Sequence, residues 1–194
     1  MANISNMENF KPIHLRNIPP PNETFKHTQY FDFLFSYLRP ENYLELGIRL
    51  GENFVPVARH CKKAIGVDIS PARFNLANNM ECHQMTTDEY FDKLADDVMF
   101  DVVFIDADHS HEQSLKDFMN VKDRVIEDGI ILMHDTYPYD MSMTHPDLCN
   151  DVYKTALYIK QNLIDDFEVF TLPINPGVTM VKKIKRNKQL IYEE

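Results

Sequence analysis

Carboxylate and imidazole side chains lie at the ends of several apolar segments of this chain or directly after them. The residues that share this placement are Glu45, Asp68, Asp106, Asp108, His109, His134 and Asp135. If the segments are parallel strands, their carboxyl ends meet at one edge of a sheet, where α/β proteins bind ligands. Carboxylates gathered there repel one another unless a positively charged ligand lies among them. The pattern therefore predicts a site for a divalent metal ion, a sulfonium or an ammonium group.

Asp106 and Asp135 are the best metal ligands of this set, because adjacent parallel strands would bring their tips together. Oxygen ligands without a thiolate favour Mg²⁺ first, and also Ca²⁺ or Mn²⁺. His134 is either a third ligand or a residue that orients Asp135. The alternative interpretation is that both aspartates only cap the helices that follow them.

His109 is the natural general base, since the unperturbed pKa of histidine lies near neutrality. His111 is a rival, but its position favours the start of a helix. Asp108 alternates with Asp106 and is therefore expected to face elsewhere. The remaining histidines of the first hundred residues are scattered and are interpreted as surface or packing residues: His14, His27, His60 and His83.

A glycine turn stands at the centre of the pattern, in the stretch Tyr43 to Gly51. A short apolar strand that stops at Gly47 and feeds a helix opening near residue 52 points unpaired backbone N–H groups at one spot. Gly47 permits a sharp turn and the close approach of a ligand, and Gly51 removes a side chain where the helix enters. Glu45 is expected to need a cationic or hydroxyl partner. Asp68 follows at the spacing, roughly 20 residues, at which an acid binds ribose hydroxyls in nucleotide-binding folds.

Strands and helices must alternate to position these residues. Hydrophobic spacing predicts strands over 43–46, 64–69, 81–85, 100–106, 129–133, 167–172 and 178–184, the last two as an antiparallel hairpin. It predicts helices over 31–38, 54–61 and 88–96, one starting at Ser70-Pro71, a long one that carries Leu115, Phe118, Met119, Val125 and Ile126, and one over 152–163. This alternation indicates an α/β fold, a mostly parallel sheet with helices on both faces. The polar segment 136–147 is expected to shape a substrate mouth.

The composition limits the kind of protein. The 194 residues are 44% hydrophobic and 26% charged, as in an ordinary soluble domain, and the net charge of −10 argues against a nucleic-acid partner. No apolar run approaches the ~20 residues that cross a bilayer. Three cysteines without paired spacing fit a reducing, cytoplasmic setting. We expect an irregular N-terminal arm over 1–24, either loosely packed or covering the active site or a neighbouring subunit, a single domain over 25–186 and a tail over 187–194.

Together these motifs resemble the class I S-adenosylmethionine-dependent methyltransferases, over roughly residues 27–184. The resemblance lies in the E-x-G-x-x-x-G loop of Glu45, Gly47 and Gly51, the acid Asp68, and Phe104-Ile105-Asp106. With Met133-His134-Asp135, the chain is similar to the metal-dependent O-methyltransferases that act on catechols and macrolide sugars. It departs from them at His134-Asp135, where members usually have two oxygen-bearing side chains.

The resemblance implies a Rossmann-like, seven-stranded sheet in the order 3-2-1-4-5-7-6 with the last strand antiparallel. It also implies a cofactor site, a metal site and a base. The cofactor residues are Glu45, Gly47, Gly51, Asp68, Ile69, Thr86, Thr87 and Asp106, the metal ligands are Asp106, His134 and Asp135, and the base is His109.

The predicted function is thus methyl transfer from S-adenosylmethionine to a small hydroxyl compound such as a sugar or a catechol, with the assistance of a divalent cation. A non-catalytic cofactor-binding protein of the same fold is one alternative. An NAD(P)-dependent oxidoreductase is another, although the glycine turn lacks the G-x-G-x-x-G pattern. A nucleic-acid methyltransferase is a weaker alternative. No membrane partner is expected, and a homo-oligomer is left open.

Overall fold

A seven-stranded sheet forms the centre of the protein, seen here in a computed structural model that describes residues 27–174 and 176–184. The strand order is β3-β2-β1-β4-β5-β7-β6, and β7 alone runs antiparallel to its neighbours β5 and β6. This confirms the predicted fold class and strand order. The strands are β1 (Asn42–Leu46), β2 (Lys63–Asp68), β3 (Met80–Gln84), β4 (Phe100–Ile105), β5 (Val125–His134), β6 (Phe167–Leu172) and β7 (Val178–Lys183). The expected arm over 1–24 and tail over 187–194 lie outside the described residues.

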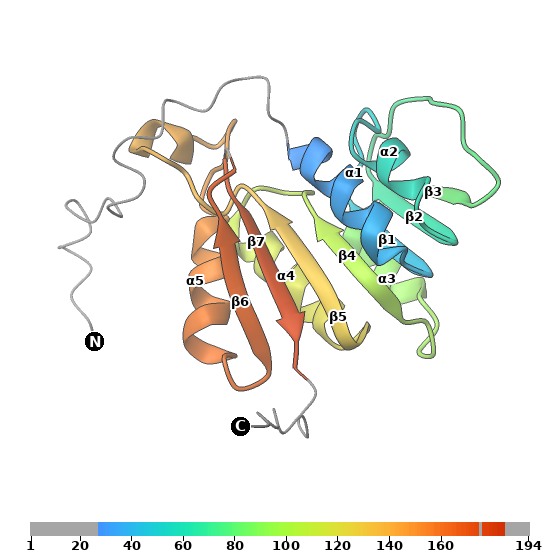
Figure 1. Cartoon of the computed structure of the whole chain (residues 1–194). Helices are drawn as coiled ribbons and strands as arrows, with labels where there is room; N and C mark the ends of the chain where they lie inside the picture. The colour runs from blue at the N-terminus through green and yellow to red at the C-terminus, as the bar shows by residue number, and fades with distance from the viewer. Residues whose placement is uncertain (1–26, 175, 185–194) are drawn as a thin grey trace.

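Helices cover the two faces of this sheet (Figure 1). They are α1 (His27–Leu38), α2 (Phe54–Ala58), α3 (Thr87–Lys93), α4 (His111–Lys122) and α5 (Tyr153–Asn162), with a 3-10 turn, η3 (Met141–Thr144). Two hydrophobic clusters separate the layers. One joins α1 and α2 to the sheet through Phe31 and Phe104, and the other joins α4 and α5 to the opposite face through Phe118 and Ile159.

Strand alternation decides which side chains reach which layer. In β1, Leu44 and Leu46 belong to the cluster under α4, whereas Tyr43 lies in the cluster under α1 and α2. Glu45 follows the same alternation and is therefore buried on the α1 side.

Within the described residues, no helix combines the length and the apolar character that crossing a membrane requires.

The long helix predicted through Val125 and Ile126 is wrong in its second half. Helix α4 ends at Lys122, and Val125 begins β5, where it pairs with Phe100 of β4. The register then shifts between Phe100 and Val102, as at a β-bulge. Apolar residues at 125 and 126 match the helical spacing of the preceding stretch, but β-branched residues also favour strands, and pairing with β4 decides between them.

The helix predicted from Ser70-Pro71 is also wrong, because residues 71–77 form no helix. The amide of Ala72 donates to the carbonyl of Arg49 (2.7 Å), and Phe74 packs against Gly51, so the segment is held against the glycine turn. Asparagines at 75, 78 and 79 also disfavour a helix.

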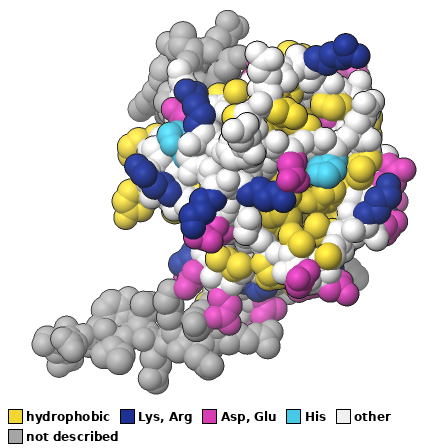
Figure 2. Space-filling view, turned by 90° about the vertical axis from the view of Figure 1, so that its right-hand side faces the viewer, with side chains coloured by type: hydrophobic (Ala, Val, Ile, Leu, Met, Phe, Trp, Pro, Cys, Tyr) yellow, Lys and Arg dark blue, Asp and Glu magenta, His cyan; other side chains and the backbone are white. Residues whose placement is uncertain are grey.

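Figure 2 shows the side of the molecule that lies on the right in Figure 1, where hydrophobic side chains are exposed between charged ones.

Candidate active site at the carboxyl edge of the sheet

The tips of three neighbouring strands are bonded to one another beyond the regular sheet. Gly47 at the end of β1 donates its amide to the carbonyl of Val67 in β2 (2.8 Å), and Asp106 after β4 donates to the carbonyl of Leu46 (2.8 Å). On the other side of β4, Ile105 pairs with Met133 of β5. The residues that follow these strands are therefore brought to one edge, as the sequence predicts.

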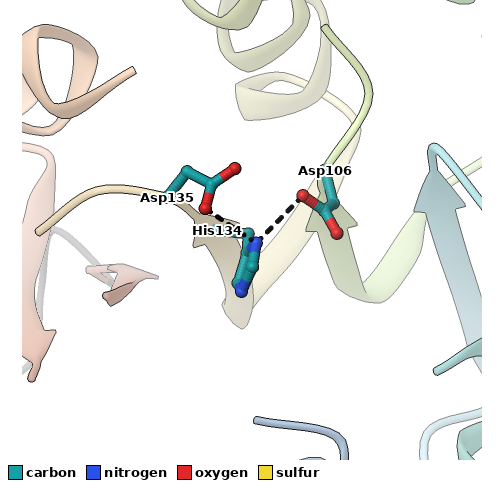
Figure 3. Close-up of side chains that lie close together, drawn as sticks. All are labelled: Asp106, His134 and Asp135. Carbon is teal, nitrogen blue, oxygen red and sulfur yellow. Dashed lines mark hydrogen bonds and ion pairs between the residues drawn. The ribbon is translucent and has the colours of Figure 1, made fainter. Parts of the chain in front are cut away.

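Asp106, His134 and Asp135 form a compact cluster at this edge (Figure 3). The Nδ1 atom of His134 lies 3.1 Å from Oδ1 of Asp106 and 3.3 Å from Oδ1 of Asp135. One ligand atom from each residue lies within 4.8 Å of the others, so the three could hold one metal ion. Burial disfavours the charged imidazole, but the two carboxylates outweigh it and raise the pKa of His134 to about 10.

Asp135 is the most enclosed member of the cluster. Its φ of +58° lies in the left-handed region, which aspartate tolerates better than most residues. Burial alone would raise its pKa, but His134, His109 and a hydrogen bond from Cys149 together lower it. The side chain of Cys149 is buried and its thiol pKa is raised to about 12, so it acts as a donor to Asp135.

His109 stands over the same carboxylates, from the loop between β4 and α4. Its Nδ1 atom lies 3.1 Å from Oδ2 of Asp135 and also contacts the carbonyl oxygen of Leu148, while Nε2 lies 3.7 Å from Oδ1 of Asp106. A carbonyl oxygen can only accept a hydrogen bond, so Nδ1 carries the proton. In the neutral ring, Nε2 is then the nitrogen that can accept a proton, which is the arrangement that a general base needs.

Glu45 lies beside this cluster but faces the protein interior. Its Oε2 atom accepts hydrogen bonds from the hydroxyl of Tyr43 (2.5 Å) and from Nδ2 of Asn53 (2.9 Å). The expected partner is thus a hydroxyl of the same strand. Burial raises the pKa of Glu45 to about 8, the two hydrogen bonds oppose this, and the charge of Asp106 adds to it.

The glycine turn adopts the sharp conformation that the sequence motif predicts. Gly47 has a φ of +87° and Gly51 a φ of +73°. A Cβ atom at Gly47 would lie 2.1 Å from the carbonyl oxygen of Asp106, so close backbone packing at the tip of β4 already requires glycine. The turn is closed from the other side by Asp68, whose Oδ2 accepts from the amide of Arg49 (2.8 Å) and whose Oδ1 accepts from the amide of Ser70 (2.7 Å).

The other predicted cofactor residues differ in their surroundings. Ile69 has 69% of its surface exposed beside Asp68. The hydroxyl of Thr86 caps α3 in a capping box with Glu89. Thr87 is buried, and its hydroxyl accepts from Nε2 of Gln113 (3.1 Å), so that this side chain is engaged between α3 and α4.

Sequence reasoning missed several residues around the site. Asn53 and Tyr43 donate hydrogen bonds to Glu45. The carbonyl of Leu148 contacts His109, and the thiol of Cys149 donates to Asp135. His27 lies against His134. Tyr43 had a signal, since it shares a strand face with Glu45 at a spacing of two. Leu148 and Cys149 had none, because they reach the site through an irregular loop.

Comparisons with known proteins agree with the fold described above. Residues 44–136 match a family model described as a methyltransferase domain. No curated protein sequence matches the chain significantly. Among solved structures, the SAH-bound methyltransferase PaMTH1 of Podospora anserina is similar with a TM-score of 0.66 and 15% identity, over 82% of this chain and 78% of that one.

Two further structures share the fold. Cofactor-bound Rv0187 from MTB has a TM-score of 0.68 and 16% identity, over 89% of this chain and 85% of that one. An O-methyltransferase from Bacillus cereus in complex with SAH has a TM-score of 0.65 and 15% identity, over 86% and 84%. The methyltransferase-domain match over residues 44–136, the strand order and the glycine turn agree with one another and with the fold that these solved structures share.

Proposed function

We propose that this protein is an S-adenosylmethionine-dependent methyltransferase that transfers a methyl group to a hydroxyl oxygen of a small molecule, such as a sugar or a catechol, with the assistance of a divalent cation. The observation that carries the proposal is the cluster of Asp106, His134 and Asp135 with His109 above it. Hydroxyl oxygens need a base and a nearby positive charge to become nucleophiles at neutral pH. His109 offers the base, and the cluster offers ligands for a divalent ion that would supply the charge.

The cofactor end of the site lies at the tips of β1 and β2. Gly47 leaves backbone without a side chain at the turn, and Asp68 offers carboxylate oxygens to ribose hydroxyls while its backbone partners hold it in place. Exposed Ile69 provides an apolar surface for an adenine ring, next to the Thr86 cap. S-adenosylmethionine, when bound, supplies a methyl group on a positively charged sulfur. Two of the similar structures hold SAH, which supports S-adenosylmethionine as the cofactor here.

The donor set of the cluster fits a divalent cation. Asp106 and Asp135 supply carboxylate oxygens and His134 supplies an imidazole nitrogen. Carboxylates suit Mg²⁺ and Mn²⁺, and the imidazole extends the fit to softer divalent ions. Such an ion, when bound, lowers the pKa of a hydroxyl group next to it.

The protein's own groups then complete the chemistry. Nε2 of His109 takes the proton from the acceptor hydroxyl, while Asp135 and the carbonyl of Leu148 hold the Nδ1–H side of the ring. Asp135 stabilises the imidazolium that results, because its buried carboxylate keeps its charge. Alignment of the acceptor oxygen with the methyl group supplies much of the remaining rate.

A methyl-transfer assay tests the proposal. The purified protein is supplied with methyl-labelled S-adenosylmethionine and a panel of catechols and sugars, with Mg²⁺, with Mn²⁺ or with EDTA. We expect label on an oxygen atom of at least one acceptor, and loss of transfer in EDTA that either metal restores. Undiminished transfer in EDTA would exclude an essential cation and leave Asp106 and Asp135 the role of orienting His134 and His109, since Ser110 and Asp140 are the residues that cap the helices after them. Cofactor binding without transfer to any acceptor would favour a non-catalytic binding protein.

The three cysteines support a cytoplasmic location as part of this proposal. Cys61, Cys82 and Cys149 are all free, and Cys61 and Cys149 are buried. Buried thiols without disulfide partners are typical of proteins that work in a reducing compartment.

A further inference from the structure

His27, the first residue of α1, lies against the metal-ligating cluster. Its ring centroid is 4.2 Å from that of His134, with the two planes inclined at 57°. The pattern of the sequence assigned His27 only to surface or packing. It does, however, stand four residues before Phe31, on the same face of the helix as the apolar stripe.

Two buried phenyl rings hold His27 in this place. Its centroid lies 5.5 Å from that of Phe31 and 5.8 Å from that of Phe104, and both phenyl side chains are fully buried. Phe31 and Phe104 also contact each other edge to face at 4.9 Å. The position of the His27 ring is therefore set by the core under α1 rather than by an exposed helix end.

The ring of His134 needs such a neighbour. Its Nδ1 side is directed at Asp106 and Asp135, but its buried Nε2 has no hydrogen-bond partner among the described residues. Histidines that bind a metal through one ring nitrogen usually donate a hydrogen bond from the N–H of the other, which fixes the orientation of the ring. No such bond is present on the far side among the described residues, and the ring of His27 and the edge of Phe104, at 6.1 Å, are the aromatic contacts that His134 makes.

We propose that His27 is a positioning residue that keeps Nδ1 of His134 aimed between Asp106 and Asp135. Without the His27 ring, His134 gains room to turn about its χ2 bond, and a turned ring presents a carbon atom to the carboxylates in place of Nδ1. The proposal rests on the proposed function for the purpose of the cluster, but it concerns the orientation of one ring. His27 acts through His134.

Binding of Mn²⁺ to the purified chain, followed by electron paramagnetic resonance of the free ion, tests this role. We expect His27→Ala to weaken Mn²⁺ binding by about 10- to 100-fold, the range typical for outer-shell partners of metal-binding histidines. His27→Phe retains a ring at the same place and should bind Mn²⁺ as the unchanged protein does. Phe33→Ala, on the exposed face of the same helix, is the matched control and should also leave affinity unchanged.

A second measurement does not depend on a metal. Nuclear Overhauser contacts from the ring protons of His134 report its orientation in the metal-free protein. One orientation is expected in the unchanged protein and in His27→Phe, and two in His27→Ala. A single orientation in His27→Ala, or a loss in His27→Phe as large as in His27→Ala, would overturn the proposal. If the unchanged protein fails to bind Mn²⁺, the cation of the proposed function is wrong, and ring orientation alone decides the role of His27.

Discussion

The two nitrogens of His109 have different surroundings, and this difference supports the role of general base proposed for it. Nδ1 faces acceptors only, the carbonyl of Leu148 and the carboxylate of Asp135, whereas Nε2 points toward Asp106 across 3.7 Å. The ring is thus held on one side and available on the other. Its side chain is 35% exposed, so a substrate can reach it.

Replacement of this ring should separate catalysis from binding. We expect His109→Ala to keep the affinity for S-adenosylmethionine nearly unchanged and to reduce turnover by roughly 10²- to 10⁴-fold, because a general base is lost. Calorimetry measures the first quantity and methyl transfer the second. His83→Ala, on the edge strand β3, serves as the control and should change neither. Equal turnover in His109→Ala would remove His109 from the mechanism.

The raised pKa of Glu45 predicts how stability depends on pH. Burial raises this pKa from 4.5 to about 8, so between these values the folded protein binds a proton that the unfolded chain does not. The free energy of unfolding should therefore fall as pH rises from about 5 to 8, with a contribution from Glu45 of up to ~1.4 kcal/mol per pH unit.

The substitution Glu45→Gln isolates this contribution. Glutamine keeps an acceptor for Tyr43 and Asn53 but does not titrate, so the slope should become flatter by the contribution of this one group. Denaturant unfolding at several pH values between 5 and 8 measures both proteins. Identical slopes would mean that Glu45 is charged in the folded protein at pH 6 to 7.

The turn between β1 and α2 joins the proposed cofactor end of the site to the cluster of carboxylates. Gly47 brings its backbone against the carbonyl of Asp106, and Arg49, with a φ of +40°, turns its amide to Asp68. One turn thereby sets the relative positions of the tips of β1, β2 and β4. A substitution at Gly47 should therefore displace the backbone of Asp106, even though glycine itself has no side chain.

We expect Gly47→Ala to lower the free energy of unfolding by about 2 kcal/mol or more, because an added Cβ meets backbone and the φ of +87° is unfavourable for alanine. Arg49→Ala is the matched control, since Arg49 is exposed and already carries a Cβ at a positive φ in the same turn. Denaturant unfolding of the two variants checks the prediction. Equal stability of Gly47→Ala and Arg49→Ala would show that the β4 tip moves away freely.

For the entire chain, the sheet edge gathers groups from β1, β2, β4 and β5 into one place, so a ligand that bridges them should stabilise the fold. At a concentration 100 times its Kd, such a ligand adds about 2.7 kcal/mol to the free energy of unfolding. For a protein of this size, we expect S-adenosylhomocysteine to raise Tm by roughly 5–10 °C.

Differential scanning fluorimetry with S-adenosylhomocysteine and with NAD makes this comparison directly. NAD is expected to leave Tm unchanged, because the turn lacks the crowded glycines that dinucleotides require. A rise in Tm with NAD alone would favour the oxidoreductase alternative over methyl transfer.

Most of the architecture could be predicted because it depends on local patterns. The apolar runs of β1, β2, β4 and β5, each with an acid or a histidine at or next to its carboxyl end, identify parallel strands and the edge where ligands bind. The mistakes occurred where two patterns overlap. Val125 and Ile126 fit both the helical spacing of α4 and the start of β5, and Ser70-Pro71 resembles a helix start that contacts with the glycine turn override.

The sequence by itself determined the fold class, the glycine turn and the set of acids and histidines at one edge, since these follow from residue types and their spacing along the chain. Only the tertiary structure decided which groups touch. Asn53 binds Glu45, Cys149 binds Asp135, and His27 packs on His134, in each case between separate elements of the fold. Such contacts depend on how helices and loops dock on the sheet, and docking is set by the burial of whole faces rather than by any local pattern.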